Sequence, residues 1–257
     1  METNVYERLK KHYNRAIAHF GEDAVFGVFL YGSWNYGTNL SDSDVDTKCI
    51  LIPDLYSLAI KPYEVTHLHI DDEFCECMSI MHMVANWKKQ NINFLEIMHT
   101  PYCIINPKYE EFWRSEDSKD LTCHPLTLEW AEKIARYDLP KAIKSMAGQA
   151  LRHLTENSND LKKVMNAMRI EYSLRELIHA PEDTPYNMII RAPLKIRGIR
   201  TGETVVTPEE IEDLKVKFQN LMDNADEYEP RNIYKKEVDK FLERFILELI
   251  EYRISIH

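Results

Sequence analysis

Residues 31–53 read YGSWNYGTNLSDSDVDTKCILIP and place a Gly-Ser pair ahead of a run of acidic residues. Apolar segments stand on both sides of the pair, AVFGVFLY at 24–31 and VDTKCILI at 45–52. Both segments are rich in the β-branched and aromatic residues that favour strands. We therefore predict a buried strand, a tight turn at Gly32, and a second buried strand that Pro53 ends.

Two aspartates, Asp44 and Asp46, follow this turn and are separated by one residue. On a strand, alternate side chains share a face, so the two carboxylates stand ~7 Å apart along the chain. Two carboxylates on one face repel each other unless a positive charge lies between them. Because Mg²⁺ prefers oxygen ligands and is often shared between carboxylates and substrate phosphates, the pair predicts a site for Mg²⁺ or Mn²⁺.

The Gly-Ser pair supplies groups that suit the phosphates of a nucleotide. Gly32 lets a phosphate approach the backbone closely, and Ser33 can donate its hydroxyl and amide hydrogens to phosphate oxygens. If a short helix begins at Ser33, its first amides add to the anion site. We therefore predict that Gly32 and Ser33 bind a nucleotide.

A two-metal site needs a third carboxylate from a neighbouring strand. The segments 64–70 and 74–80 read as two strands around the acidic turn DDE. We expect Glu76, in FCECMSI, to be the third acid, and Asp72 or Glu73 takes this role if the register differs. A DxD pair alone is ordinary loop composition, but its combination with the Gly-Ser turn favours a functional site.

The remaining sequence predicts a second, helical part of the chain. Beyond a strand at 102–105, the pattern of apolar residues becomes helical. Helices are predicted at residues 4–20, 80–87, 126–156 with a break at Pro140, 160–179, 207–228 and 230–253. We therefore predict an α+β protein. A domain with a small mixed sheet and flanking helices covers residues 1–115, and a mainly helical domain covers 116–257.

Composition limits the function classes. The chain has 257 residues, of which 44% are hydrophobic, so it can build a packed core, and its net charge of −10 disfavours extended nucleic-acid binding. No apolar stretch approaches the ~20 residues of a membrane span. The five cysteines lack the paired spacing of a zinc site. We predict a cytoplasmic protein with reduced thiols that does not enter the membrane.

The stretch LYGSWNYGTNLSDSDVDTKCI resembles the signature of the DNA polymerase β-like nucleotidyltransferase superfamily, in which hG[GS] is followed, after a spacer, by [DE]h[DE]h. Within that superfamily the chain is most similar to the predicted nucleotidyltransferases linked to RNA repair, the RlaP-like branch. ECMSIMHMVANWKKQNINFLEIM, AGQALRHL and KKVMNAMRIEYSLREL carry the rest of the resemblance, which covers roughly residues 25–180. Two positions depart from the branch, with Asn166 where His is frequent and Ile92 where proline is usual.

The resemblance implies an activity and a role for each motif residue. A nucleoside triphosphate, with ATP among the candidates, would bind at Gly32 and Ser33. Asp44 and Asp46 would hold both metals, and Glu76 would ligate the catalytic one. The enzyme would move a nucleoside monophosphate to an acceptor hydroxyl, for which an RNA end such as that of a tRNA comes first.

Two further groups of basic residues are candidate contacts. Lys162 and Arg169 lie seven residues apart on one predicted helix and share a face that can meet the triphosphate or an RNA phosphate; a solvated helix face is the alternative. RAPLKIRGIRTGE is the densest basic stretch, and we predict a loop or hairpin there that contacts nucleic-acid phosphates. Its basic residues are Arg191, Lys195, Arg197 and Arg200.

Other interpretations stay open at this point. The acceptor can also be a protein hydroxyl or a small molecule, and a binding module that kept the fold without catalysis is a separate class. Glu96 follows an apolar Phe-Leu pair and is expected to be a structural hydrogen-bonding acid. Trp34 and Tyr36 either stack on a base or cap the core.

Overall fold

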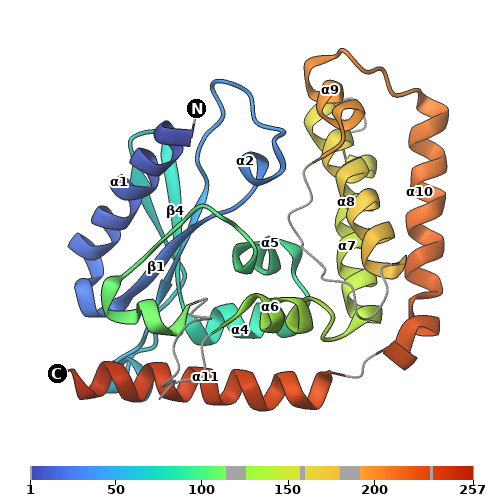
Figure 1. The fold of residues 1–257 in the computed structure, drawn as a ribbon. Coiled ribbons are helices and arrows are strands. Elements are labelled where there is room, and N and C mark those ends of the chain that lie inside the picture. Colours follow the sequence, from blue (N-terminus) through green and yellow to red (C-terminus); the bar gives the residue numbers. More distant parts are fainter. Residues whose placement is uncertain (1, 114–125, 157–159, 180–191, 232–233, 257) are drawn as a thin grey trace.

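The protein has a mixed α and β structure with one sheet, helices on both sides of it, and a helical part beside it (Figure 1). The computed structural model describes residues 2–113, 126–156, 160–179, 192–231 and 234–256. The predicted α+β class is therefore confirmed. The predicted domain boundary between residues 115 and 116 lies outside the described residues.

The sheet has the strand order β3-β4-β2-β1-β5. Its strands are β1 (Val25–Leu30), β2 (Thr47–Leu51), β3 (Thr66–Ile70), β4 (Glu73–Ser79) and β5 (Cys103–Ile105). β2 and β4 pair in parallel, and the other neighbours pair antiparallel. All five strands lie where the sequence predicts them. However, β2 begins at Thr47, so Asp44 and Asp46 precede the strand instead of alternating along it.

Helices make up most of the rest of the described chain. They are α1 (Glu2–Phe20), α2 (Ser33–Tyr36), α3 (Leu55–Ala59), α4 (Ile80–Lys88), α5 (Ile92–Leu95), α6 (Leu128–Ala135), α7 (Leu139–Glu156), α8 (Leu161–His179), α9 (Leu194–Thr201), α10 (Pro208–Asp223) and α11 (Lys235–Ser255). Short 3₁₀ turns occur at Glu22–Ala24, Glu96–Met98, Pro107–Phe112 and Ala225–Arg231. Every helix in the described ranges is too short or too polar to span a lipid bilayer.

Local sequence signals account for several helix ends. The predicted break is confirmed, because α6 ends at Ala135 and α7 restarts with Pro140 in its first turn, where a missing N–H costs nothing. α10 begins with a capping box, in which the Thr207 hydroxyl accepts from the Glu210 amide at 3.2 Å and the Glu210 carboxylate accepts from the Thr207 amide at 2.8 Å. These signals are local, so the sequence alone predicts them correctly.

One predicted element is wrong. The basic stretch expected to form a loop or hairpin forms α9 instead, which Gly202 ends in the left-handed conformation at φ 76°. The helix packs against α8 and buries Ile196 and Ile199. These two apolar residues lie three apart on one helix face, and their burial against α8 outweighs the turn signal of the glycines.

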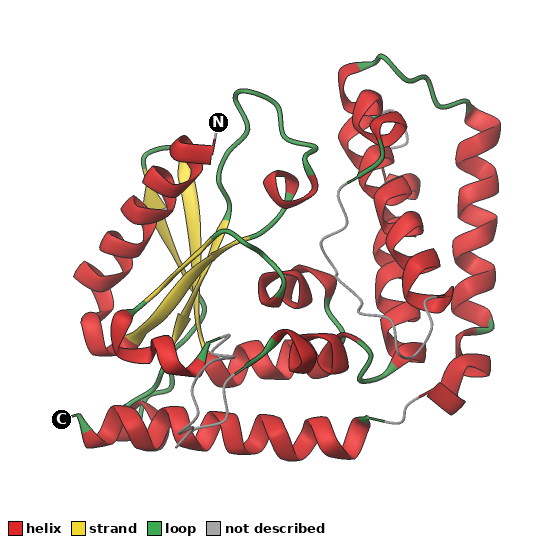
Figure 2. Cartoon of the chain, viewed as in Figure 1, coloured by secondary structure: helices red, strands yellow, loops and turns green. Residues whose placement is uncertain are grey.

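Helices pack beside the sheet (Figure 2), and an apolar layer lies on each of its two faces. α1 packs on one face, where Val5, Leu9 and Ala16 contact inward residues of β1 and β2. Phe26 and Phe29 belong to the opposite layer, which also includes residues of α4 to α8 and α11. Since this second core continues without a break into the helical part, the two parts of the described chain are packed together.

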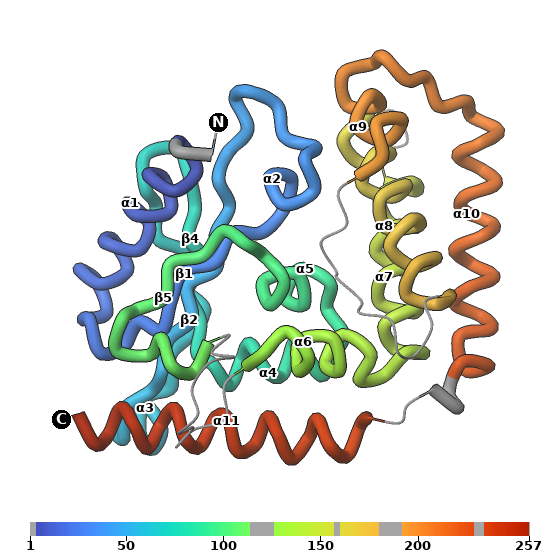
Figure 3. Tube along the Cα trace, in the orientation of Figure 1, coloured from blue at the N-terminus to red at the C-terminus, as the bar shows by residue number. Residues whose placement is uncertain are grey.

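The last helix, α11, returns from the helical part to the first half of the chain and passes close to α3 (Figure 3). Its Arg253 is 5% exposed and donates to the carbonyl oxygen of Ile52, just after β2. The same guanidinium lies 3.4 Å from the Tyr63 hydroxyl and 3.5 Å from the Asp54 carboxylate. Arg253 therefore fixes the end of α11 to the sheet.

We expect Arg253→Met to lower the free energy of unfolding by about 3 kcal/mol, because it leaves the buried Ile52 carbonyl without its donor. Arg244→Met on the same helix is the matched control. Arg244 is exposed, and its one ion pair within the described ranges is the i,i+4 contact with Glu248, so its loss should cost about 0.5 kcal/mol or less. Urea unfolding followed by circular dichroism measures both. Equal losses would show that the Arg253 contacts do not fasten α11.

Candidate functional site

The turn after β1 is built around Gly32. This residue adopts φ 86° and ψ −148°, a region that residues with a Cβ rarely adopt, and it begins the short helix α2 at Ser33. A Cβ placed at Gly32 would lie 3.8 Å from Oδ2 of Asp46. The predicted tight turn is therefore confirmed, the short helix that the sequence left open does begin at Ser33, and the Asp46 carboxylate faces the turn directly.

Main-chain contacts hold the aspartate segment against this turn. The Trp34 indole donates to the Asp44 carbonyl oxygen at 2.9 Å, and the Tyr31 amide donates to the Asp46 carbonyl oxygen at 3.1 Å. Within the described part of the chain, neither aspartate carboxylate accepts a hydrogen bond or forms an ion pair. The segment is thus fixed through its backbone, while both side chains keep their oxygen atoms for other ligands.

The two aspartates influence each other electrostatically. Burial raises the pKa of Asp46, and the nearby negative charge of Asp44 raises it further. The cations Lys162 and Lys48, together with His12, oppose this shift. A divalent cation between the two carboxylates would remove the repulsion, so the donor set and its charge fit Mg²⁺ or Mn²⁺.

Glu96 holds the Gly32 turn in place through hydrogen bonds. Its side chain is buried; Oε1 accepts the Gly32 amide hydrogen at 2.9 Å and Oε2 accepts the Tyr36 hydroxyl. Burial raises the pKa of Glu96, and the Arg169 guanidinium opposes this effect. The expectation of a structural hydrogen-bonding acid is confirmed. Tyr36 is 2% exposed, so it caps the core.

The predicted phosphate contacts on α8 reach the same turn. The Arg169 guanidinium lies 3.7 Å from the centre of the Tyr36 ring. Arg169 is buried, and within the described residues its Nε and Nη1 atoms have no hydrogen-bond acceptor. Lys162 is exposed and lies close enough to Asp46 to lower its pKa. Arg169 therefore borders the turn through Tyr36, the charge of Lys162 acts on Asp46, and contact of either residue with a phosphate stays a prediction.

Glu76 lies on β4 opposite Lys48 of β2, with which it forms an ion pair. The Lys48 side chain is buried, and its Nζ atom lies 4.2 Å from the centre of the Tyr31 ring and 4.3 Å from that of Phe94. The pKa of Tyr31 is raised by burial and then by the charges of Asp46, Glu76 and Glu96. The three acids thus gather around Tyr31.

The described residues contain no group of three His, Cys, Asp or Glu side chains placed to hold a metal ion. Asp44 and Asp46 offer two carboxylates, but a carboxylate oxygen of the expected third ligand, Glu76, is bound by Lys48. The role of Glu76 as a metal ligand therefore stays a prediction, and it requires the Lys48 ion pair to rearrange.

Glu73, which the sequence places in a turn, is the first residue of β4 and is buried on the α1 side. Its Oε1 atom accepts the Val45 amide hydrogen at 2.9 Å and also pairs with Arg8. Its Oε2 atom lies 3.1 Å from His12 Nε2, and His12 Nδ1 lies 2.7 Å from the Thr47 hydroxyl. Because Val45 stands between the two aspartates, Glu73 holds their backbone in place.

Strand alternation is the one sequence signal that could have revealed Glu73. It shares a sheet face with Cys75 and Cys77, both buried, which indicates an inward side chain. Its engaged oxygens make it unsuitable as the third metal ligand, and Asp72 is exposed in the turn. Of the three acids considered from the sequence, Glu76 alone faces the side of the sheet that carries Lys48.

The basic stretch does not form one exposed surface. Arg191 lies outside the described residues. Arg200 donates to the Thr38 carbonyl oxygen at 2.8 Å, so it anchors the loop that follows α2. Lys195 is exposed and lies 3.9 Å from Glu210, and Arg197 is half-buried. Arg200 therefore braces the loop after α2, and Lys195 is the most accessible of the three described cations of this stretch.

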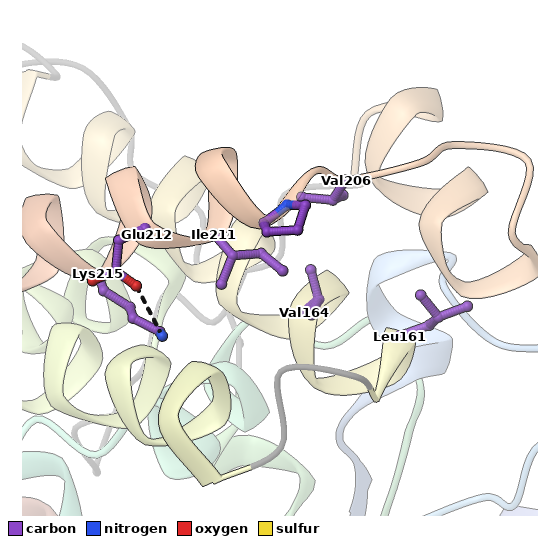
Figure 4. Close-up of a pocket in the computed structure, with 7 residues that line it drawn as sticks. Leu161, Val164, Val206, Ile211, Glu212 and Lys215 are labelled. Atoms are coloured by element: carbon purple, nitrogen blue, oxygen red, sulfur yellow. Dashed lines mark hydrogen bonds and ion pairs between the residues drawn. The ribbon is translucent and has the colours of Figure 1, made fainter.

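An apolar hollow of about 430 Å³ lies between α8 and α10 (Figure 4). Val164 from α8 and Ile211 from α10 line it, and Glu212 and Lys215, which also line it, form an ion pair of 3.1 Å. None of the predicted site residues is among its described lining residues. The candidate site therefore remains at the Gly32 turn.

Comparisons with known proteins do not identify a relative. A scan against protein-family models gives no match, and no curated protein matches the sequence. The resemblance of the Gly-Ser and Asp motif to the nucleotidyltransferase superfamily consequently remains a prediction from the sequence.

We expect Asp46→Asn to raise the melting temperature of the metal-free protein at pH 7.5 by about 1–3 °C. The folded state raises the pKa of Asp46, so the ionised carboxylate costs stability above that pKa, and removing its charge stabilises the fold. The gain should shrink as the pH falls and Asp46 becomes protonated. Thermal unfolding in EDTA, measured from pH 7.5 downward, tests this expectation, and the exposed Asp42→Asn is the control. An increase in melting temperature that is the same at every pH would contradict the electrostatic explanation.

We expect Glu73→Ala to lower the free energy of unfolding by about 3 kcal/mol, because it leaves the Val45 amide and the Arg8 and His12 side chains without their shared partner. Asp72→Ala, the exposed neighbour, should cost about 0.5 kcal/mol or less. Chemical unfolding of both variants measures the difference. A mild effect at Glu73 would mean that this network does not hold the aspartate segment.

Proposed function

We propose that the protein is a metal-dependent nucleotidyltransferase, which moves a nucleoside monophosphate from a nucleoside triphosphate to an acceptor hydroxyl. One observation carries the proposal: the Asp46 carboxylate faces the positive-φ Gly32 turn, 3.8 Å from the position of a Cβ there. Phosphates that approach this turn would meet, on one side, two carboxylates that have no hydrogen-bond or ion-pair partner among the described residues. Such a juxtaposition suits a triphosphate bound with divalent cations.

The residues of this chain have distinct roles in the proposed reaction. Gly32 and Ser33 donate to the triphosphate, and Lys162 and Arg169 neutralise its charge. Divalent cations held by Asp44 and Asp46 would activate the attacking hydroxyl and stabilise the leaving pyrophosphate. The acceptor oxygen attacks the α-phosphorus, the bond to the pyrophosphate oxygen breaks, and the hydroxyl proton passes to solvent or a carboxylate. Most of the rate gain then comes from placement and charge neutralisation.

We further propose an RNA end, such as that of a tRNA, as the acceptor and a cytoplasmic location. The cations near the turn, Arg169 and Lys162, are local exceptions in a chain of net charge −10. A few local cations are better suited to binding one end of an RNA strand than to binding along a duplex. The buried free thiols of Cys49, Cys75 and Cys77 suit a reducing compartment.

A second candidate is a nucleotide-binding module without catalysis. It is favoured by the ion pair between Lys48 and Glu76, which occupies the acid expected to complete the metal site. The two proposals differ in their dependence on the metal. Titration calorimetry with each nucleoside triphosphate, with and without Mg²⁺, separates them, because a module of this kind binds the nucleotide equally well without the metal.

We expect Asp44→Asn and Asp46→Asn each to reduce transfer of α-labelled nucleotide by at least about 10³-fold, because each removes a charge that holds the cations. Glu76→Gln should reduce transfer as strongly if Glu76 joins the metal site, and by about tenfold or less if it only pairs with Lys48. Asp42→Asn is the matched control and should transfer normally.

Incubation with total RNA and, separately, total protein identifies the labelled acceptor. An active Asp46→Asn enzyme, or label in neither pool together with metal-independent nucleotide binding, would refute the proposed activity.

A further inference from the structure

A polar groove of about 390 Å³ lies between the start of α5 and one face of α7. We name it the α5–α7 groove. Ser145, Gln149, Arg152 and His153 line it from α7, and Asn93 lines it from α5. Ser145, Gln149 and His153 follow one another at four-residue intervals, and Arg152 lies seven residues after Ser145, so the four share one face of that helix. Every described residue of the lining is polar or charged.

Several of these side chains have unused hydrogen-bonding capacity. Within the described residues, Asn93, Ser145 and Gln149 make no side-chain hydrogen bond, although all three are half-buried. Each amide offers a donor and an acceptor side by side, which is the pattern that pairs with the edge of a nucleobase. Because the side chains stand on helices, their positions are largely set before a ligand binds.

The charge of the groove is positive, unlike that of the whole chain. Lys89 and Arg152 line it, and neither forms an ion pair within the described ranges. The acid among the lining residues, Glu156, lies 3.7 Å from Lys163. Burial lowers the pKa of His153, and the charges of Lys163, Arg169 and Arg152 lower it further against the opposing charge of Glu156. Phosphate groups are the anions that such a site attracts.

The α5–α7 groove adjoins the candidate site at two points. Asn93 is followed by Phe94, whose ring lies 4.3 Å from Lys48 Nζ, and Lys48 pairs with Glu76. On the α7 side, the charge of Arg169, which stacks on Tyr36 beside the turn, lowers the pKa of His153. We therefore expect the end of a chain bound in the groove to reach the carboxylates.

We propose that the α5–α7 groove binds single-stranded RNA and is the subsite for the acceptor strand. Lys89 and Arg152 contact backbone phosphates, and the Asn93 and Gln149 amides hydrogen-bond a base edge. RNA binding in the groove stands on the contacts described above, whereas its role as the acceptor subsite rests on the proposed nucleotidyltransferase function.

Fluorescence anisotropy with a fluorescein-labelled ten-nucleotide single-stranded RNA tests the binding, using the full chain in EDTA without nucleotide. We expect Arg152→Ala and Gln149→Ala each to weaken binding about tenfold. Arg152→Ala should also reduce the salt slope by about 0.7, as the loss of one phosphate contact to a single strand requires, and Gln149→Ala should leave the slope unchanged. Lys141→Ala is the matched control, because Lys141 is an exposed cation of α7 outside the groove.

The outcomes separate this proposal from the proposed function. The proposal that the α5–α7 groove binds RNA is refuted if the unmodified chain does not bind RNA. It is also refuted if Arg152→Ala and Lys141→Ala weaken binding equally. The proposal is refuted in favour of a protein acceptor if the groove variants no longer transfer label to protein while they bind RNA as tightly as the unmodified chain. If Asp46→Asn and the unmodified chain bind RNA equally and the groove variants do not, the groove is supported even where no transfer is detected; in that case the proposed function alone fails.

Discussion

The candidate site depends on one buried carboxylate. Glu96 accepts the Gly32 amide hydrogen and the Tyr36 hydroxyl, and the Arg169 guanidinium of α8 stacks on the same Tyr36 ring. Burial of this charge is costly, and the hydrogen bonds together with the nearby cation offset that cost. The positive-φ turn, the short helix after it and the helical part of the chain are therefore held in one arrangement, and the position of Asp46 follows from it.

A second carboxylate fixes the same segment from the other face of the sheet. Glu73 accepts the amide hydrogen of Val45, between the two aspartates, and is itself held by Arg8 and His12. Backbone contacts thus place the aspartates while their carboxylates stay unpartnered within the described chain. The raised pKa of Asp46 shows that this arrangement costs stability. Proteins commonly tolerate such a cost where a ligand will later relieve it.

The sequence predicts the parts of the structure that local patterns determine. The strands, the Gly32 turn, the break before Pro140 and the capping box at Thr207 all follow from neighbouring residues. The contacts of Glu73, Lys48 and Arg200 could not be predicted, because each joins elements far apart in the chain. Alternation along β4 indicates which face Glu76 occupies, but its pairing with Lys48 depends on the parallel register of β2 and β4.

The distribution of charge limits what the site can bind. A net charge of −10 repels a polyanion at long range, and salt screening reduces this repulsion beyond about 10 Å. Close to the turn, Lys162 and Arg169 oppose the charge of the carboxylates, and Arg152 is a further cation on the neighbouring α7. An anion is then attracted where it contacts these cations and is repelled by the rest of the protein surface. Under the proposed function, this distribution would favour contact with one end of a nucleic acid over binding along its length.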